Sequence, residues 1–192
     1  MLLITEPVYL GSKSPRRRKL LKQLGLQFRS FSVDLMEELL DGEHPIRTVK
    51  RLSREKMFEA AKKVEKGIVI TADTIVVLNK EIIGKPTNKK DAIRTLKKLS
   101  GKTHSVYTGF AVFNKSRDHI IVDYEKTSVT FHNLTNKQIV DYVGTGSPMD
   151  KAGAYGIQDD FGAVFVKKVN GCFYNVMGLP LSKLYQTLLK VI

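Results

Sequence analysis

The first third of the chain alternates between strand-like and helix-like spacing of hydrophobic residues. It predicts a strand at 7–11, a helix at 15–24, a strand at 26–33 and a helix at 45–63. Ser14 is a favourable N-cap for the first helix, and Gly25 suits the position after its last turn. The residues expected to face the core are Leu20, Leu21 and Leu24 in the first helix and Val49, Leu52, Met57, Ala60 and Ala61 in the second.

The rest of the chain combines one long apolar run with hairpins. Residues 67–78, "GIVITADTIVVL", predict a strand buried on both faces. Around it we expect a hairpin partner in 79–86, a helix from Asn88 to Ser100–Gly101, strands near 104–114 and 119–131, a helix from Thr135 to Val143 closed by Gly144, a strand at 163–169 and a helix near 180–190. This order predicts a single domain over 1–192, an α/β fold with a mixed twisted sheet, flanking helices and a smaller second lobe.

Charge and composition narrow the function classes. The chain has 192 residues, 27% of them charged, and a formal net charge of +13, which favours an anionic partner such as nucleic acid, an acidic membrane surface or a phosphorylated small molecule. One cysteine, Cys172, excludes an intramolecular disulfide and a cysteine-based zinc site. The N-terminal "MLLITEPVYL" is too short and too polar for a membrane span, so we expect a cytoplasmic protein with no membrane partner.

The start of the first helix carries an unusual concentration of positive charge. Arg16, Arg17, Arg18 and Lys19 occupy the first turn, where the helix dipole is already positive and acidic residues are normally favoured. Backbone N–H groups together with Arg16 and Arg17 would bind phosphate oxygens there. Arg18 and Lys19 point away from that position by the rotation of the helix, and we expect them to be solvated.

Asp73 is the strongest local anomaly, because its neighbours in "IVITADTIVV" are apolar on both sides. Burying an ionised carboxylate is costly without a partner. One interpretation is a structural, hydrogen-bonded aspartate at a bulge. The other, which we favour, is a carboxylate that holds a metal ion or accepts a proton from water.

Three further stretches each have a functional and an ordinary interpretation, and a fourth, around Lys56, has the ordinary one. Lys85 in "GKP" could reach a phosphate or be a solvated loop lysine, and the acidic 34–38, "DLMEE", could hold Mg²⁺ or be an exposed turn. Lys56 lies on a helix whose polar face is basic and mostly solvated. In 150–158, "DKAGAYGIQ", Gln158 could read a base, although a compact connecting loop explains the same glycines.

In combination, these stretches resemble the Maf family of nucleotide pyrophosphatases. The matching segments are "SKSPRR" at 12–17, "ADTIVV" at 72–77, "GKP" at 84–86, "LSGKTHSVYTG" at 99–109, "DKAGAYGIQ" at 150–158 and "VMGLPL" at 176–181. They follow the family's order over almost the whole chain. Two differences are Gly11, where the family usually has alanine, and "QDDFGA" at 158–163, which contains two acidic residues in place of a glycine-rich turn.

The resemblance implies a fold, a reaction and a set of site residues. The fold is that of the inosine-triphosphate pyrophosphatases, with two lobes around a cleft, and commonly a homodimer. The reaction splits a nucleoside triphosphate into the monophosphate and pyrophosphate with a divalent metal, Mg²⁺ or Mn²⁺. Asp73 matches the family's proton acceptor, and the residues matching the phosphate and metal site are Ser12, Arg16, Glu37, Lys56 and Lys85. Glu38 is the alternative to Glu37.

Three positions track base preference within the family. Arg17, Thr74 and Gln158 resemble the set of the dTTP/UTP class, so the resemblance implies hydrolysis of those nucleotides or of modified pyrimidine nucleotides. The alternatives are a pyrophosphatase for 7-methyl-GTP or purines and, outside the enzymes, a nucleic-acid-binding module. The sequence contains no recognisable nucleic-acid-binding motif, and we expect no stable nucleic-acid partner.

Overall fold

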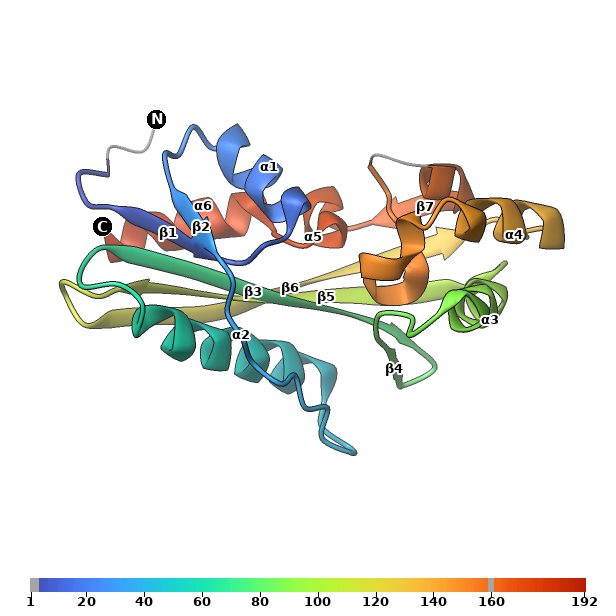
Figure 1. Ribbon diagram of the computed structural model, residues 1–192, viewed down its shortest axis with the longest axis horizontal. Coiled ribbons are helices and arrows are strands. Elements are labelled where there is room, and N and C mark those ends of the chain that lie inside the picture. Colours follow the sequence, from blue (N-terminus) through green and yellow to red (C-terminus); the bar gives the residue numbers. More distant parts are fainter. Residues whose placement is uncertain (1–3, 159–160) are drawn as a thin grey trace. The chain divides into compact units, whose positions relative to one another are not determined.

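The computed structural model describes residues 4–158 and 161–192, so Asp159 and Asp160 of the "QDDFGA" stretch lie outside the described residues. Seven strands form one mixed sheet in the order β2-β1-β3-β5-β6-β7, with β4 paired to β3 (Figure 1). Together with its flanking helices, this sheet confirms the predicted α/β class. Within the described residues, every helix is too short or too polar to cross a bilayer.

The elements follow the predicted order closely. The strands are β1 (Val8–Gly11), β2 (Arg29–Phe31), β3 (Ile68–Leu78), β4 (Glu81–Ile83), β5 (Thr103–Asn114), β6 (His119–Phe131) and β7 (Val166–Asn170). The α-helices are α1 (Pro15–Gln23), α2 (Pro45–Ala61), α3 (Lys89–Leu99), α4 (Asn136–Gly144), α5 (Phe173–Met177) and α6 (Leu181–Val191). Three short 3₁₀ helices are η1 (Ser147–Asp150), η2 (Ala152–Ala154) and η3 (Phe161–Phe165).

The chain divides into two compact units, and strands β3, β5 and β6 contribute to both. The first unit comprises Met1–Asp73, Thr108–Glu125 and Gly178–Ile192, and the second comprises Thr74–Tyr107 and Lys126–Met177. The boundary in β3 falls directly after Asp73.

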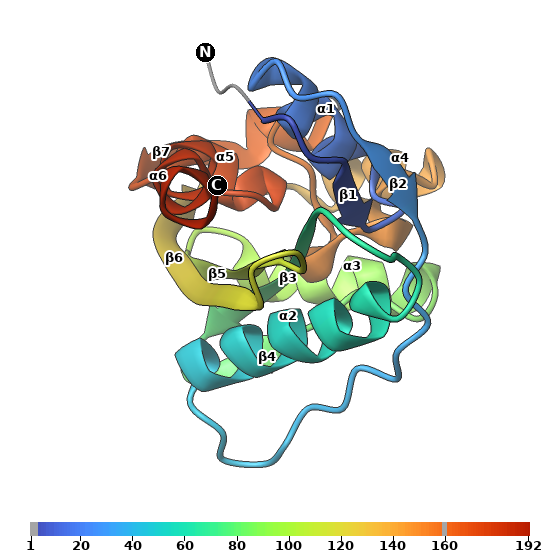
Figure 2. The same cartoon turned by 90° about the vertical axis from the view of Figure 1, so that its left-hand side faces the viewer.

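The first unit is a sheet covered on both faces. Strand β1 pairs in parallel with β2 and β3, which places Leu10 opposite Ser30 and Ile70. Helix α2 covers one face of the sheet, and α1 and α6 cover the other (Figures 1 and 2). The core under α2 contains Met57, Ala60, Ala61, Val64, Val69 and Ala111, with Phe113, Ile120 and Val122 packed against it. This double cover explains why β3 is almost continuously apolar.

Helix α2 comes unusually close to β5 at Gly109. A Cβ atom added at Gly109 would lie 2.1 Å from the Val49 carbonyl oxygen and 2.4 Å from the Val49 carbonyl carbon. A side chain there would therefore push α2 away from the sheet. The "TG" of the segment 99–109 thus sets the distance between the helix and the strand.

Gly11, one of the two differences from the family pattern, has a steric explanation. A Cβ atom at this position would lie 2.8 Å from Cγ2 of Thr71 and 3.0 Å from the Ala60 and Val33 side chains. Glycine is therefore the residue that fits beside Thr71 on the neighbouring strand.

The second unit combines sheet extensions with helices α3 and α4. Strand β4 returns antiparallel to β3 through a turn in which Asn79 and Lys80 have positive φ, and β7 pairs antiparallel with β6. Helix α3 packs against α4 and against η1 and η2. An aromatic cluster lies among these elements, with T-shaped contacts that join His104, Phe131, Tyr142, Tyr155 and Phe165.

Most predicted helix starts are confirmed at atomic detail. The side chain of Ser14 accepts from the Arg17 N–H, and that of Asn88 accepts from the Asp91 N–H. Thr135 and Gln138 form the reciprocal capping box at α4. These side chains satisfy N–H groups that the helix itself leaves without a carbonyl partner.

Three boundaries and one additional helix differ from the sequence prediction. The expected strand at 26–33 is ordered as β2 only over three residues, because its partner β1 has just four. Residues 161–165 form η3, and pairing with β6 begins at Val166, opposite the last residue of β6. Gly144 is the final residue of α4, and Gly146, with φ of 77°, makes the left-handed turn. Helix α5 was not predicted, since five residues show no helical period.

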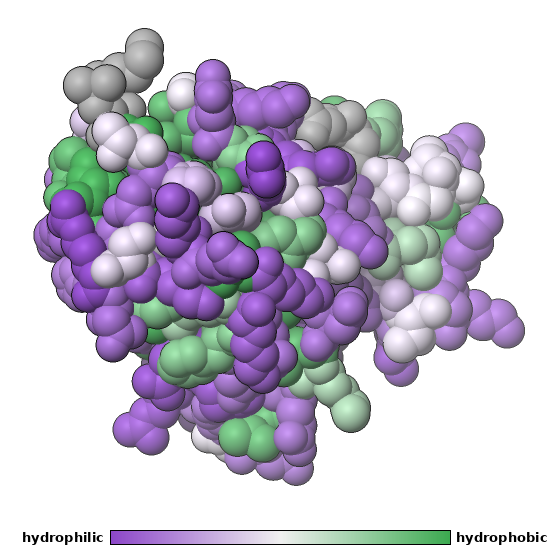
Figure 3. Space-filling view, turned by 60° about the vertical axis from the view of Figure 1, so that its left-hand side comes forward, coloured by the Kyte–Doolittle hydropathy of each residue, from purple (hydrophilic) through white to green (hydrophobic). Residues whose placement is uncertain are grey.

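One face of the molecule is dominated by hydrophilic residues (Figure 3). On the face shown in Figure 3 they cover most of the area, and hydrophobic residues form small separate groups. Such a surface agrees with a chain in which 27% of residues are charged.

Substituting Gly109 by alanine tests the close approach of α2. We expect Gly109→Ala to lower the free energy of unfolding by more than about 2 kcal/mol, because backbone atoms of α2 must move. Gly144→Ala is the matched control: a Cβ atom there meets nothing within 4 Å. It should leave stability unchanged or raise it by up to about 1 kcal/mol. Urea denaturation measures both, and equal stabilities would contradict the packing argument.

Candidate active site

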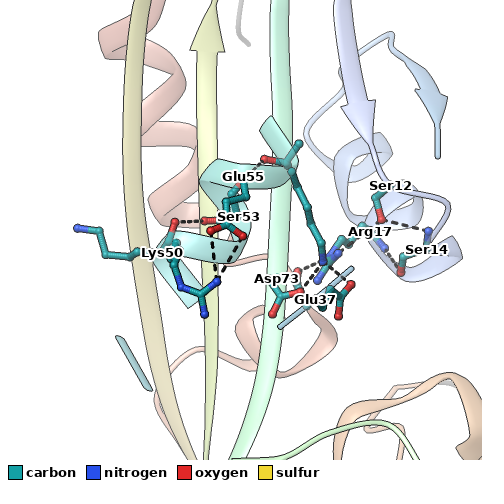
Figure 4. A network of polar contacts seen from close by, with 12 residues as sticks. Ser12, Ser14, Arg17, Glu37, Lys50, Ser53, Glu55 and Asp73 are labelled. Atoms are coloured by element: carbon teal, nitrogen blue, oxygen red, sulfur yellow. Dashed lines mark hydrogen bonds and ion pairs between the residues drawn. The ribbon is translucent and has the colours of Figure 1, made fainter. Parts of the chain in front are cut away.

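Three charged side chains of the first unit meet at the end of its part of β3. Asp73 is 5% exposed, and its Oδ1 lies 2.5 Å from the Lys56 ammonium nitrogen. The same nitrogen lies 2.7 Å from Oε1 of Glu37. In Figure 4 the carboxylates of Asp73 and Glu37 lie next to each other and are joined by dashed lines to one nitrogen. Lys56, which the sequence left open as a solvated residue, is 8% exposed.

A buried hydrogen bond sets the register between α2 and β3. The Thr71 hydroxyl donates to the Ser53 carbonyl oxygen over 2.6 Å. Thr71 and Asp73 are two apart on a strand and so point to the same face, while Ser53 and Lys56 are three apart on a helix and lie on the same side. The hydrogen bond between Thr71 and Ser53 therefore brings Lys56 close to Asp73.

Helix α1 contributes Arg17 to the cluster, and hydrogen bonds of the Arg17 guanidinium group fix its position. The Nε of Arg17 donates to the Gly178 carbonyl oxygen over 2.8 Å, and Nη1 is 3.5 Å from the Ser12 hydroxyl. Burial lowers the pKa of Arg17, and the negative charges of Asp73 and Glu37 act in the opposite direction. Figure 4 shows Arg17 beside Ser12 and Ser14. These contacts hold the guanidinium near both carboxylates.

The other three basic residues of the first turn differ in exposure, as the rotation of the helix predicts. Arg16 is half-buried like Arg17, whereas Arg18 and Lys19 are exposed. The paired arginines therefore lie on the side of α1 that faces the protein.

The acidic segment 34–38 supplies one carboxylate to this cluster. Glu37 pairs with Lys56, whereas Glu38 accepts a hydrogen bond from Arg51 through its backbone carbonyl. The structure therefore places Glu37 beside Asp73 and turns the Glu38 side chain to solvent.

The remaining residues implied by the resemblance belong to the second unit. Thr74 and Gln158 are half-buried, and Lys85 is exposed. Lys85 borders a hollow of about 330 Å³ whose other charged residues carry both signs: Glu81, Asp91, Arg94 and Lys98. The Gly153 N–H donates to the Gly84 carbonyl oxygen over 3.0 Å, which joins the "GKP" turn to the segment 150–158. Gln158 accepts from the Ile157 N–H through Oε1 at 3.2 Å.

Buried tyrosines hold the segment that carries Gln158. The Gly156 N–H donates to the Tyr142 hydroxyl over 3.1 Å, and the Tyr155 hydroxyl lies 2.8 Å from Nε2 of His104. Burial raises the pKa of Tyr155 and lowers the pKa of His104 to about 4, so both groups are neutral near pH 7. The segment is therefore fixed by neutral hydrogen bonds and ring packing.

A comparison with protein families identifies the relatives of this chain. The family model described as "Maf-like protein" matches residues 7–191. The chain belongs to the Maf-like family. Relatives named "dTTP/UTP pyrophosphatase" share 45% identity over 181 residues in Aquifex aeolicus and 46% over 181 residues in Geobacter sp. (strain M21), and each alignment covers 94% of this chain and 93% of the relative.

Among solved structures, the Staphylococcus aureus Ham1 protein aligns with 96% of this Maf-like chain and 98% of its own, at a TM-score of 0.47 and 13% identity. This likeness is too low to establish a shared fold. The α/β class therefore rests on the sheet and helices described above.

The carboxylates of this Maf-like chain suit a hard divalent cation. In the described residues, no group of three or more His, Cys, Asp or Glu side chains is placed to hold a metal ion. Glu37 and Asp73 nevertheless each contact the Lys56 ammonium through one carboxylate oxygen and so lie close together, and Mg²⁺ is commonly bound by one or two carboxylates together with substrate phosphates. The donor set therefore fits a metal ion that arrives with a phosphorylated ligand.

Sequence reasoning missed the residues that hold the cluster in place. Gly178 accepts from Arg17 through its carbonyl, and Ser53 does the same for Thr71. Backbone acceptors leave no signal in a sequence, since every residue has one. Gly178 lies far from α1 in the chain, so local patterns do not link the two. The family motif "VMGLPL" was the only hint that Gly178 belongs near the site.

The buried His104 predicts a specific dependence of stability on pH. Its folded-state pKa lies below the unfolded value near 6.5, so the unfolded chain binds the extra proton. The free energy of unfolding should be unaffected above that value and fall by on the order of 3 kcal/mol as the pH drops to about 4. His104→Gln should remove this component from a chemical-denaturation series. His119→Gln, at an exposed position, should retain it; identical slopes in the two variants would contradict the assignment.

Proposed function

We propose that this protein is a nucleoside triphosphate pyrophosphatase that hydrolyses dTTP and UTP to the nucleoside monophosphate and pyrophosphate. The observation that carries the proposal is the buried ammonium of Lys56 shared by Asp73 and Glu37, with Arg17 beside them. Buried charged clusters of this kind are typical of catalytic sites. The names of relatives at about 45% identity over nearly the whole chain support the same reaction.

Phosphate binding in this proposal begins at α1. Arg16 and Arg17 offer planar, permanently charged donors suited to phosphate oxygens. Arg17 is already oriented by Gly178 and Ser12, so little ordering remains when a ligand binds. The family resemblance assigns Lys85 to the phosphates as well. Each such preorganised contact is worth about 2–4 kcal/mol in the transition state.

Proton transfer in the proposal is assigned to Asp73. Its contact with Lys56 uses Oδ1, and the carboxylate has a second oxygen with which to accept a proton from water. The resulting hydroxide attacks the α-phosphorus, the bond to the bridging oxygen breaks, and pyrophosphate leaves. Lys56 compensates the charge of the two carboxylates before the reaction.

A divalent cation, Mg²⁺ or Mn²⁺, is part of this proposal. Glu37 and Asp73 would hold it together with phosphate oxygens, as the oxygen donors of the cluster suggest. When bound, such a cation withdraws charge from the phosphates and so stabilises the leaving pyrophosphate.

Selection of the base is assigned to Gln158. Its carboxamide has both a donor and an acceptor, as the edge of a thymine or uracil requires. The resemblance also attributes base preference to Arg17 and Thr74. The buried contacts of Tyr142 and Tyr155 support this role, because they fix the segment in which Gln158 lies.

The resemblance to Maf proteins further supports a cytoplasmic homodimer with no stable nucleic-acid partner. Light scattering after size exclusion measures the mass in solution. Polymer binding at low and high salt tests the nucleic-acid alternative, for which a net charge of +13 predicts steep salt dependence.

Replacing Asp73 by asparagine tests the proton acceptor. We expect kcat for pyrophosphate release from dTTP to fall by about 10²- to 10⁴-fold, because an amide cannot accept the proton. The control Asp141→Asn removes the same charge from an exposed ion pair on α4 and should leave kcat unchanged. A folded Asp73→Asn protein with wild-type turnover would exclude Asp73 as the base.

Exchanging Gln158 for glutamate tests the base preference. The change removes the amide donor, and we expect kcat/KM for dTTP and UTP to fall about tenfold, as for the loss of one hydrogen bond. Gln186→Glu, at an exposed position of α6, is the control. The assay compares dTTP, UTP, CTP, ATP, GTP, ITP and 7-methyl-GTP. Wild-type preference for 7-methyl-GTP or ITP would retain the reaction and overturn the pyrimidine assignment.

A further inference from the structure

The segment that carries Glu37 has almost no apolar anchor. Between residues 34 and 44 no side chain is buried, and Met36, Leu39 and Leu40 are 91%, 47% and 45% exposed. Loops are usually held in place by burying some of their apolar side chains. The position of Glu37 must therefore depend on polar contacts.

Arg51 supplies most of these contacts from the first half of α2. Its Nη2 donates to the Glu38 carbonyl oxygen over 2.9 Å, directly after Glu37 in the chain. Nε and Nη2 also donate to the two carboxylate oxygens of Glu43, at 3.0 and 2.7 Å. Nη1 lies 3.3 Å from both oxygens of Glu55, one turn further along α2. One guanidinium thus clamps both ends of the segment 38–43 to the helix.

The contact between Arg51 and Glu43 is shielded and strongly coupled. The two side chains are only 21% and 14% exposed, respectively. The hydrogen bonds that Arg51 donates to the Glu43 carboxylate lower the pKa of Glu43 and raise the pKa of Arg51. Two-point contacts of this kind are stronger and more directional than a lysine contact. Because the guanidinium also reaches Glu38 and Glu55, a single ammonium group cannot replace it.

We propose that Arg51 is a positioning residue: it holds the segment 38–43 on α2 and thereby keeps Glu37 against Lys56 in the active site. The catalytic part of this inference rests on the proposed pyrophosphatase function. Arg51 lies five residues before Lys56 on the same helix, so the clamp and the ammonium move as one body. Without the clamp, the position of Glu37 on this exposed segment depends mainly on its ion pair with Lys56.

Proteolysis tests the clamp without any assay of activity. A glutamyl endopeptidase cleaves after Glu37 and Glu38 only when the segment opens. We expect Arg51→Ala to speed this cleavage roughly tenfold or more, as the loss of a charge-assisted hydrogen bond predicts. Arg51→Lys should give an intermediate rate. Arg54→Ala removes the same charge at an exposed position on α2 and should cleave at the wild-type rate. Equal rates in Arg51→Ala and wild type overturn the proposal.

Kinetic coupling tests whether the clamp acts through Glu37. We expect Arg51→Ala to lower kcat/KM for dTTP by roughly 10- to 100-fold, as is typical for a residue that orients a site carboxylate. The double variant Arg51→Ala/Glu37→Gln should be no less active than Glu37→Gln alone. Additive losses would overturn the role of Arg51 in positioning Glu37. A wild-type protein that releases no pyrophosphate would refute the proposed function, and the cleavage rates would still decide whether Arg51 holds the segment.

Discussion

The ammonium group of Lys56 is the interaction on which the candidate active site depends. It lies between Asp73 and Glu37, and the carboxylate of Asp73, which is 5% exposed, could not be buried there without a charged partner except at a large cost in free energy. Removing one member of a buried ion cluster leaves the others uncompensated, which is more costly than the loss of a surface pair. The packing of α2 on β3 and β5 therefore has a functional consequence, because a small shift of the helix would separate Lys56 from Asp73.

Three separate sets of hydrogen bonds hold the members of this cluster. The Thr71 hydroxyl fixes α2 on β3 through Ser53, and Gly178 fixes the guanidinium of Arg17. Arg51 holds the segment that carries Glu37. The acceptor is a backbone carbonyl for Thr71 and for Arg17, and a carbonyl together with carboxylates for Arg51. These hydrogen bonds orient the charged groups before any ligand binds, which favours electrostatic stabilisation of a transition state.

The second unit is held together near its candidate site residue by uncharged contacts. Its segment 150–158 is held by neutral tyrosine and histidine side chains inside a cluster of aromatic rings. Such contacts orient a segment without placing net charge nearby. In the proposed function these contacts suit the recognition of an uncharged base edge, whereas the half-buried arginines at the start of α1 suit phosphates.

The sequence alone determined the order of the strands and of the longer helices, the caps of α1, α3 and α4, and the α/β class, because these follow from local periodicity and from capping side chains such as Ser14 and Asn88. It also marked Asp73, since a carboxylate inside an apolar strand is anomalous wherever the strand lies. Only the tertiary structure decided that Lys56 is buried, that Glu37 and not Glu38 lies beside Asp73, and that Arg51 holds their segment. These outcomes depend on contacts between residues distant in the chain and on backbone carbonyls, which every residue has, so no local pattern could reveal them.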